Sequence, residues 1–396
     1  MKRLAVLLSI SLLAGCASVA PRVEPPPPVF ADASFAPPSE PVRTDTLFDL
    51  SPEMRAYLGS SRFTTILRER GERHGLVEAL YRKSDLQLEY ESSKTRTAAE
   101  TYAARSGNCL SLVIMTAAFA KALGMPVQFQ NIDAQNTWSR ESGLFLASSH
   151  VNILLSDRRM PNAYSVGSEI ELVVDFIPSD AAARLRARII DEQDILALYA
   201  NNRAAEMLVQ GRVDDAYWWA RAAVQARPQM ISVLNTLGVI YQRHGDLAMA
   251  EKTFQSALVR EPENILVMRN LHPVLLELGK RDEALALDQR IKSIEPVPPY
   301  HYFDQGILAL KEGDARKAKS LFEREIKRAP YNDEFRFWLG IAYARMGDVR
   351  EAREQVTLAV ENSTRRELRE RYSAKLAFLR QLSMDSRGHT GRVRYQ

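Results

Sequence analysis

The strongest constraint on the fold is a 34-residue period in the C-terminal half of this 396-residue chain. Glycine recurs at one phase of the period, alanine recurs five residues later, and proline closes the first four units. The recurring residues are Gly211, Gly245, Gly279, Gly313 and Gly347; Ala216, Ala250, Ala284, Ala318 and Ala352; and Pro228, Pro262, Pro296 and Pro330. Such a repeat predicts one supersecondary unit that stacks on its own copies, because a single unit cannot bury its apolar face alone.

The second unit carries further residues of a known pattern, namely Leu237-Gly238, Tyr241, Phe254 and Ala257. At these offsets the chain resembles the tetratricopeptide repeat, a helix–turn–helix unit. The resemblance implies an all-α solenoid of five tetratricopeptide units over residues 191–364.

The third unit departs from the pattern at two positions. His272-Pro273 stands where a small residue is expected, and Asp288 replaces an aromatic residue. We therefore expect this unit to be kinked or less tightly packed. Residues 365–396 are basic, and we interpret them as a capping helix and tail, which the open end of a solenoid requires.

The resemblance also implies a concave groove, lined by the first helix of each unit, that binds a protein or peptide partner. Carried onto this chain, it predicts a set of groove residues: Arg243, Arg269, Phe303, Lys311, Phe337 and Arg345. Cations among aromatic rings favour an extended peptide with acidic side chains or a free carboxylate. The alternative is that Phe303 and Phe337 pack between helices and the cations are solvated. The net charge of +4 is too small to indicate a nucleic-acid partner.

The N-terminus has the pattern of a secretion signal over residues 1–16. Lys2 and Arg3 precede a short apolar run, which ends at Leu13-Ala-Gly-Cys16. This ending resembles the bacterial lipobox, in which the cysteine is acylated. The resemblance implies a lipid-anchored envelope protein. Alanine at the next position points, in that family, to the periplasmic face of the outer membrane. Residues 17–45 are proline-rich and predict a semi-stiff tether to the membrane.

The second of only two cysteines, Cys109, is placed at the start of an expected apolar helix. Asn108 is a helix N-cap residue, while Gly124 and Pro126 are typical of a helix end. A thiol at a helix N-terminus faces unpaired N–H groups and the positive end of the dipole, which favour the thiolate. The alternative is a buried structural cysteine, since free cysteine is among the most buried residue types.

Residues 46–185 predict an α+β domain. Short helices are expected before Cys109, and strands follow it at 127–132, 150–155 and 170–176. If the last two strands form a hairpin with its tip near residues 161–164, His150 stands opposite Asp175. A carboxylate that holds an imidazole in this way gives a general base that could activate a nucleophile.

Cys109 at a helix start, followed by His150 and Asp175 on strands, resembles the transglutaminase-like branch of papain-fold cysteine enzymes. The most specific part is Arg105-Ser-Gly-Asn-Cys-Leu-Ser111. The resemblance implies a Cys–His–Asp triad and acyl transfer at amide bonds, as in a cysteine peptidase or amidase. The cysteine is often lost in the branch with this motif, so a non-catalytic scaffold for envelope protein assembly is the alternative. The sequence shows no metal-binding cluster and no cofactor motif.

Overall fold

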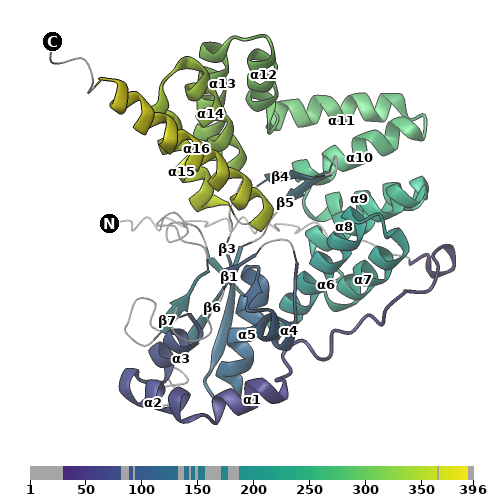
Figure 1. Ribbon diagram of the computed structural model, residues 1–396. Helices are drawn as coiled ribbons and strands as arrows, with labels where there is room; N and C mark the ends of the chain where they lie inside the picture. Colours follow the sequence, from purple (N-terminus) through teal and green to yellow (C-terminus); the bar gives the residue numbers. More distant parts are fainter. Residues whose placement is uncertain are drawn as a thin grey trace, which may run out of the picture.

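The computed structural model describes residues 30–81, 89–91, 94–132, 138–141, 144–147, 150–156, 171–176, 187–363 and 365–390. An α+β region comes first, and a succession of helix pairs follows it (Figure 1). None of the described helices is both long enough and apolar enough to cross a membrane. The expected signal segment, with Cys16, lies outside the described residues.

The α+β region is built around an antiparallel sheet with strand order β7–β6–β3–β8. The strands are β3 (Val127–Ile132), β6 (His150–Ser156), β7 (Glu171–Val174) and β8 (Ala187–Ile190). The first three are the strands expected from the sequence. β8 was not expected, and it extends the sheet beyond the boundary placed at residue 185.

Helix α5 (Cys109–Ala122) packs on this sheet and contributes many of the buried residues of the core between them. Every residue from Cys109 to Ala120 is buried, as the uninterrupted apolar sequence predicts. Gly124 has a positive φ of 70°, and the N–H of Met125 donates to the carbonyl of Ala120, so the helix ends where expected.

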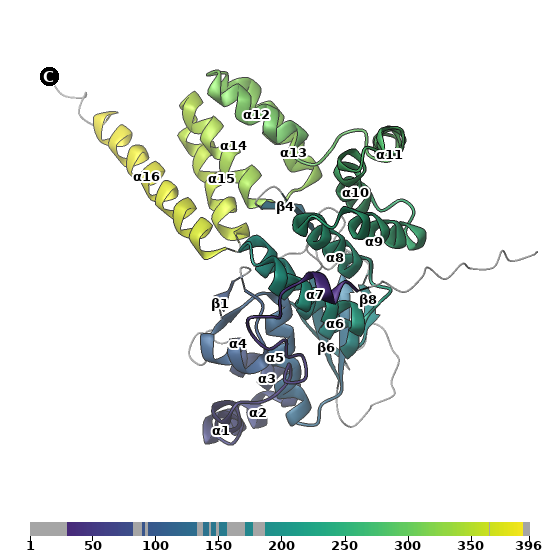
Figure 2. The ribbon, with the colours of Figure 1, turned by 90° about the vertical axis from the view of Figure 1, so that its right-hand side faces the viewer.

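Four shorter helices cover α5 and the sheet, and two small pairs of strands complete the region. The helices are α1 (Pro52–Leu58), α2 (Ser61–Arg70), α3 (Glu72–Tyr81) and α4 (Ala98–Ala104). The strand pairs are β1 (Glu89–Tyr90) with β2 (Ser106–Gly107), and β4 (Trp138–Glu141) with β5 (Leu144–Ala147). In both views the β4–β5 hairpin is drawn between the two groups of repeat helices (Figures 1 and 2).

The second region consists of five helix pairs and a final helix, in agreement with the 34-residue period. The pairs are α6 (Glu192–Val209) with α7 (Val213–Ala226), α8 (Ile231–His244) with α9 (Leu247–Arg260), α10 (Ile265–Glu277) with α11 (Arg281–Ile294), α12 (His301–Lys311) with α13 (Ala315–Arg328), and α14 (Asp333–Met346) with α15 (Val349–Asn362). The recurring glycine joins the two helices of every pair with φ between 76° and 96°, a conformation that a side chain would strain.

Within a pair, a second recurring glycine brings the two helices together. A Cβ atom on Gly238 would lie 2.5 Å from the ring of Phe254, and the same relation joins Gly306 to Phe322. The third pair lacks this contact, because His272 and Asp288 occupy the equivalent positions. Only two residues of α11 are buried, so the third pair is loosely packed as expected, although α10 continues through Pro273.

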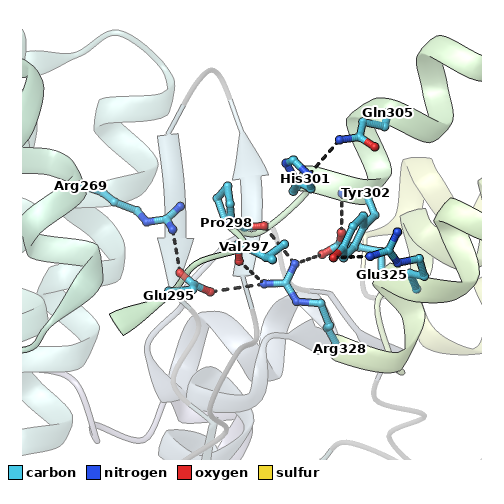
Figure 3. A network of polar contacts seen from close by, with 10 residues as sticks. Arg269, Glu295, Val297, Pro298, His301, Tyr302, Gln305, Glu325 and Arg328 are labelled. Atoms are coloured by element: carbon cyan, nitrogen blue, oxygen red, sulfur yellow. Dashed lines mark hydrogen bonds and ion pairs between the residues drawn. The ribbon is translucent and has the colours of Figure 1, made fainter. Parts of the chain in front are cut away.

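The repeats do not form one continuous apolar core. The first three pairs share one apolar core with the α+β region. The last residue of this core in the sequence lies in α11, and a separate core begins at Tyr300. A polar network joins the two parts at residues 295–300 (Figure 3). In it, Arg328 contacts Glu325, Glu295 and the carbonyls of Val297 and Pro298. The two parts are therefore joined at this point through hydrogen bonds and ion pairs.

The final helix α16 (Arg366–Thr390) covers the end of the fifth pair, as the expected capping helix should. The ring of Tyr372 stacks on Phe337 with 4.5 Å between centroids. Leu376 and Leu379 complete a small apolar cluster with α15.

Residues 30–45, which we name the N-terminal strap, are not the unattached tether that the sequence predicts. They run across α7 before the chain enters the α+β region (Figures 1 and 2). Trp218 donates to the carbonyl of Ala36, and Phe35 stacks on Tyr217. The tether prediction therefore fails for this segment, because its polar and aromatic groups find partners almost two hundred residues away.

Candidate active site around Cys109

Cys109 is the first residue of α5, directly after the short strand β2 and the extended N-cap residue Asn108. Asn108 caps this helix by accepting a hydrogen bond from the N–H of Ser111 at 2.9 Å. The amide of Asn108 also donates to the Thr95 hydroxyl at 2.8 Å. The cysteine is thus fixed at the end of α5 where backbone N–H groups lack helical acceptors and the helix dipole is positive.

The close approach of β2 to the start of α5 depends on Gly107. A Cβ atom at Gly107 would lie 2.7 Å from Cβ of Ser111, which is too close for any side chain. Ser111 is needed there because its hydroxyl donates to Asn108 and accepts from the N–H of Arg96 at 2.9 Å. The Gly-Asn-Cys-Leu-Ser sequence therefore specifies the position of the cysteine.

His150 and Asp175 lie together, but in a different register from the one expected. In β6 and β7, Ile153 pairs with Val174, which places Asp175 beside Asn152 and not opposite His150. The predicted register was wrong by two residues, because turn-forming residues suggest where a hairpin bends but do not fix its loop length. A two-residue error keeps a side chain on the same face. Nε2 of His150 lies 2.7 Å from Oδ1 of Asp175.

Asn152, which the sequence analysis did not select, is the third polar residue of this face. It is 3% exposed, and its Nδ2 lies 3.5 Å from Oδ2 of Asp175. Its Oδ1 is buried without a hydrogen-bond partner in the part of the chain that the structure describes. The spacing of two residues from His150 was the available signal, because alternate residues of a strand share a face.

The environment of His150 favours its charged form. Burial opposes the charge, but the hydrogen bond with Asp175 and the interactions with Cys109 outweigh it and raise the pKa of His150 to about 9. At neutral pH the imidazole is therefore protonated when Asp175 is ionised.

The contact between Cys109 and His150 is looser than the contact between His150 and Asp175. The side chain of Cys109 acts on the pKa of His150 through hydrogen bonding and charge. Nevertheless, Nδ1 of His150 has no well-aligned hydrogen-bond partner in the described part of the chain. We regard the contact as an approach of the two groups and not as a formed hydrogen bond, since such bonds are often long before substrate binds.

These three side chains could perform nucleophilic chemistry at a carbonyl carbon. The thiol is the nucleophile by type, the imidazole is the proton carrier, and the carboxylate fixes one ring nitrogen so that the other faces the thiol. Among the described residues, no group of three or more His, Cys, Asp or Glu side chains is arranged to hold a metal ion.

The residues expected to line the groove of the repeats lie in different structural environments. Phe303 and Phe337 are buried in the cores, so their assignment to a binding surface was wrong, and they pack between helices. Arg269 is half-buried and donates to Glu295 at 2.7 Å. Arg345 is exposed and donates to the carbonyl of Leu310.

Arg243 and Lys311 are also exposed. The two rings are therefore buried, whereas the four cations remain accessible at least in part. The two phenylalanines fill positions at which the repeat needs an apolar residue between helices.

Comparison with known proteins supports the assignment of the repeats. Residues 303–365 match the family model described as tetratricopeptide repeat. A protein named STIP1 homolog from Dictyostelium discoideum is 30% identical over 150 residues, covering 36% of this chain and 24% of its own length. The chain therefore spans about a quarter of that relative.

Among solved structures, a thermophilic tetratricopeptide protein of Thermus thermophilus is 20% identical, with a TM-score of 0.28. It covers 46% of this chain and 99% of its own. MamA from Desulfovibrio magneticus RS-1 is 18% identical, with a TM-score of 0.26, and covers 43% of this chain and 96% of its own. The assignment rests on the family match and on the repeated helix pairs, not on these superpositions. Residues 303–365 of this chain are thus similar to the tetratricopeptide repeat, and the helix pairs before them recur with the same 34-residue period.

Proposed function

We propose that the chain is a thiol-dependent acyl-transfer enzyme of transglutaminase-like type, and that its repeats bind a protein partner. Cys109 is the nucleophile, His150 carries the proton and Asp175 orients the imidazole. The single observation that supports this assignment most is the 2.7 Å contact between Nε2 of His150 and Oδ1 of Asp175, beside a cysteine at a helix N-terminus. The protonated state of His150 matches the thiolate–imidazolium pair that such chemistry uses.

The reaction follows from the positions of the two ring nitrogens. Because Asp175 holds Nε2, Nδ1 of His150 is the atom that exchanges a proton with the thiol and the leaving group. Cys109 Sγ attacks the carbonyl carbon of an amide, and the negative charge on oxygen develops near the first N–H groups of α5. The C–N bond breaks as Nδ1 protonates the amine, which leaves a thioester. Water then adds to the thioester while Nδ1 accepts its proton, and the acid and the thiolate are released.

We favour water over an amine as the second substrate because water is abundant and no amine site is evident in the sequence. The acyl group would come from an amide bond of a protein or peptide, which suits a peptidase or amidase. The repeats would recruit the partner that carries this bond. The match of residues 303–365 to the tetratricopeptide family supports this role, since stacked repeats present extended binding surfaces.

We further propose that the chain is anchored in the bacterial envelope by acylation of Cys16, at the periplasmic face of the outer membrane. The lipobox-like Leu13-Ala-Gly-Cys16 supports this proposal. If Cys16 carries lipid, Cys109 is the one thiol left in an oxidising compartment, and it has no cysteine partner for a disulfide.

A non-catalytic scaffold is the second candidate function, and one observation favours it. Cys109 is only 8% exposed and His150 only 6%, so both groups are more enclosed than a substrate-ready pair needs to be. In that case Cys109, His150 and Asp175 would serve only to hold α5 against the sheet.

The rate at which iodoacetamide alkylates Cys109 separates the two functions. The rate should be measured between pH 5 and 9 by mass spectrometry of the peptide that contains Cys109. We expect the parent protein to react at pH 6 at least about ten times faster than free cysteine, and His150→Ala to lose this advantage. His74→Ala is the matched control, because His74 is an exposed histidine on α3. A parent rate that follows free cysteine across the pH range, and does not respond to His150→Ala, would contradict the enzymatic function.

A further inference from the structure

The N-terminal strap contacts α7 and α8 in the way that a bound peptide contacts its receptor. Only Phe35 is buried among residues 30–45. A segment that belonged to the core of the domain would bury several of its side chains. The strap instead uses one buried anchor, a few polar side chains and its own backbone, which is how bound peptides are usually recognised.

Asp32 is the charged group of the strap that α7 binds through hydrogen bonds. Its Oδ1 accepts hydrogen bonds from the hydroxyl of Tyr217 at 2.6 Å and from Nε of Arg221 at 2.9 Å. The hydrogen bond from Tyr217 lowers the pKa of Asp32, so the carboxylate is ionised in this position. The pair of donors on α7 therefore selects an acidic side chain.

Phe35 is the buried anchor. Its ring stacks on that of Tyr217 with 3.9 Å between centroids and 2° between planes. The rings of Tyr241 and His244, at the end of α8, lie 5.9 Å and 4.2 Å away and complete the site. Three aromatic groups around one ring select an aromatic side chain.

The stretch from Ala36 to Ser39 is bound mainly through its backbone, and the Ser39 hydroxyl adds contacts by donating to Asp215 and accepting from Arg212. Asp214 accepts from the N–H of Ala36 at 3.0 Å, and Asp215 accepts from the N–H of Ser39 at 2.7 Å. Trp218 donates to the carbonyl of Ala36 at 2.7 Å. The two residues between are Pro37 and Pro38, which have no N–H group to satisfy and hold the backbone extended.

We propose that the surface of α7 and α8 is a peptide-recognition site, and that the strap is its ligand within the same chain. The site selects a segment in which one turn of 3-10 helix (Asp32–Ser34) places a carboxylate three residues before an aromatic ring, with paired prolines after it. Any protein that presents such a segment would compete with the strap for this surface. The inference does not depend on the chemistry at Cys109.

The test is to offer the strap sequence as a separate molecule to the full-length chain. The probe is a fluorescein-labelled synthetic peptide of residues 30–42, and fluorescence polarisation measures its binding. The receptor is the double variant Asp32→Ala/Phe35→Ala, in which the attached strap has lost its two selective groups. We expect this variant to bind the peptide saturably, and the parent to bind it at least about ten times more weakly, because the attached strap acts at a millimolar effective concentration.

Two controls show whether binding occurs at the proposed site. Adding Arg221→Ala to the double variant, or replacing Asp32 by alanine in the peptide, should each weaken binding about tenfold or more. Circular dichroism establishes that the variants are folded. A folded double variant that does not bind the peptide, or that binds both peptides equally, would overturn the proposal.

A second form of the experiment avoids any change in the part of the strap that is bound. A protease site is introduced at residues 43–45, where Arg43 and Asp45 are exposed, and is cleaved after folding. The released strap should then exchange with the labelled peptide. A cleaved chain that loses its strap and takes up no peptide would contradict the inference.

Discussion

Nε2 of His150 lies 2.7 Å from Oδ1 of Asp175, although the two residues are not direct cross-strand partners. The contact runs diagonally from β6 to the residue that follows β7, and Asn152 occupies the place beside Asp175. His150 and Asn152 are two residues apart on β6, so both side chains reach the same carboxylate. The orientation of the imidazole is therefore set by a pair of neighbouring strands.

We expect Asp175→Asn to lower the pKa of His150 and to destabilise the fold in a pH-dependent way. The pKa of His150 is about 9 in the folded protein and about 6.5 in an unfolded chain. Because the folded value is the higher one, the stabilisation is fully present below about pH 6.5 and is lost as the pH rises through about 9. The variant should lose about 1–3 kcal/mol of unfolding free energy at pH 6.

Urea denaturation of parent and variant at pH 6 and pH 10 measures this loss. The difference between them should be markedly smaller at pH 10. Glu171→Gln, on the same strand β7, is the matched control and should show no such pH dependence. Equal differences at both pH values would mean that Asp175 does not hold the protonated imidazole.

The sequence predicted the residue types of this site but not its geometry. Asn108 and Gly124 act within one or two turns of the chain, so local chemistry was sufficient to place them. The register of β6 and β7 depends on a loop length that turn residues do not encode. Asn152 was missed because a buried amide can be assigned to the site only when the carboxylate that it contacts is known.

The repeats were predictable for the same reason, and the strap was not. Each recurring glycine adopts a positive φ in the turn between two helices. Because every unit needs this turn, the glycine recurs in the sequence with the period of the repeat. The hydrogen bond between Asp32 and Tyr217 joins residues 185 positions apart. A contact at this separation cannot be predicted from a local sequence pattern. Proline-rich composition predicted a tether, but it did not predict that residues 30–45 would be bound by α7.

We expect Cys16→Ser to release the chain from the membrane, because acylation of that cysteine is the proposed anchor. Membrane fractionation of cells and the mass of the processed N-terminal peptide measure the effect. Cys109→Ser is the control, since it removes the other thiol and should leave membrane association unchanged. If Cys16→Ser stays in the membrane fraction with an unchanged processed mass, the anchor proposal fails.

We expect Phe337→Ala to destabilise the C-terminal repeats by about 3–5 kcal/mol, because it removes a buried aromatic ring and leaves a cavity. Phe337 packs on Tyr372 of α16, so the capping helix should become more accessible to proteolysis. Leu308→Ala, at a position that is 56% exposed on α12, should change stability by less than about 0.5 kcal/mol. Thermal unfolding and limited proteolysis measure both effects. If the Phe337→Ala chain were as stable as the parent but had lost partner binding, Phe337 would belong to the binding groove and not to the core.

The last prediction concerns Arg328, which joins the two parts of the repeat region. Its guanidinium donates to Glu325 at 3.0 Å and to the carbonyl of Val297 at 2.7 Å. The side chain of Glu325 is 3% exposed. Without Arg328 this carboxylate would keep its hydrogen bond from the N–H of Tyr302 but lose its ion-pair partner.

We therefore expect Arg328→Ala to destabilise the last two helix pairs by about 2–4 kcal/mol, because a buried carboxylate without its cation is costly. Hydrogen exchange should rise in α12–α15, while the exchange of α5 and α6 should not change, since those helices belong to the separate core. Arg316→Ala, at an exposed position of α13, is the matched control and should leave exchange unaltered. Arg328→Lys should recover part of the loss, because an ammonium group keeps the charge but cannot reach Glu325 and the two backbone carbonyls together. If Arg328→Ala exchanged as slowly as the parent throughout α12–α15, the junction would be held by its apolar contacts and not by this network.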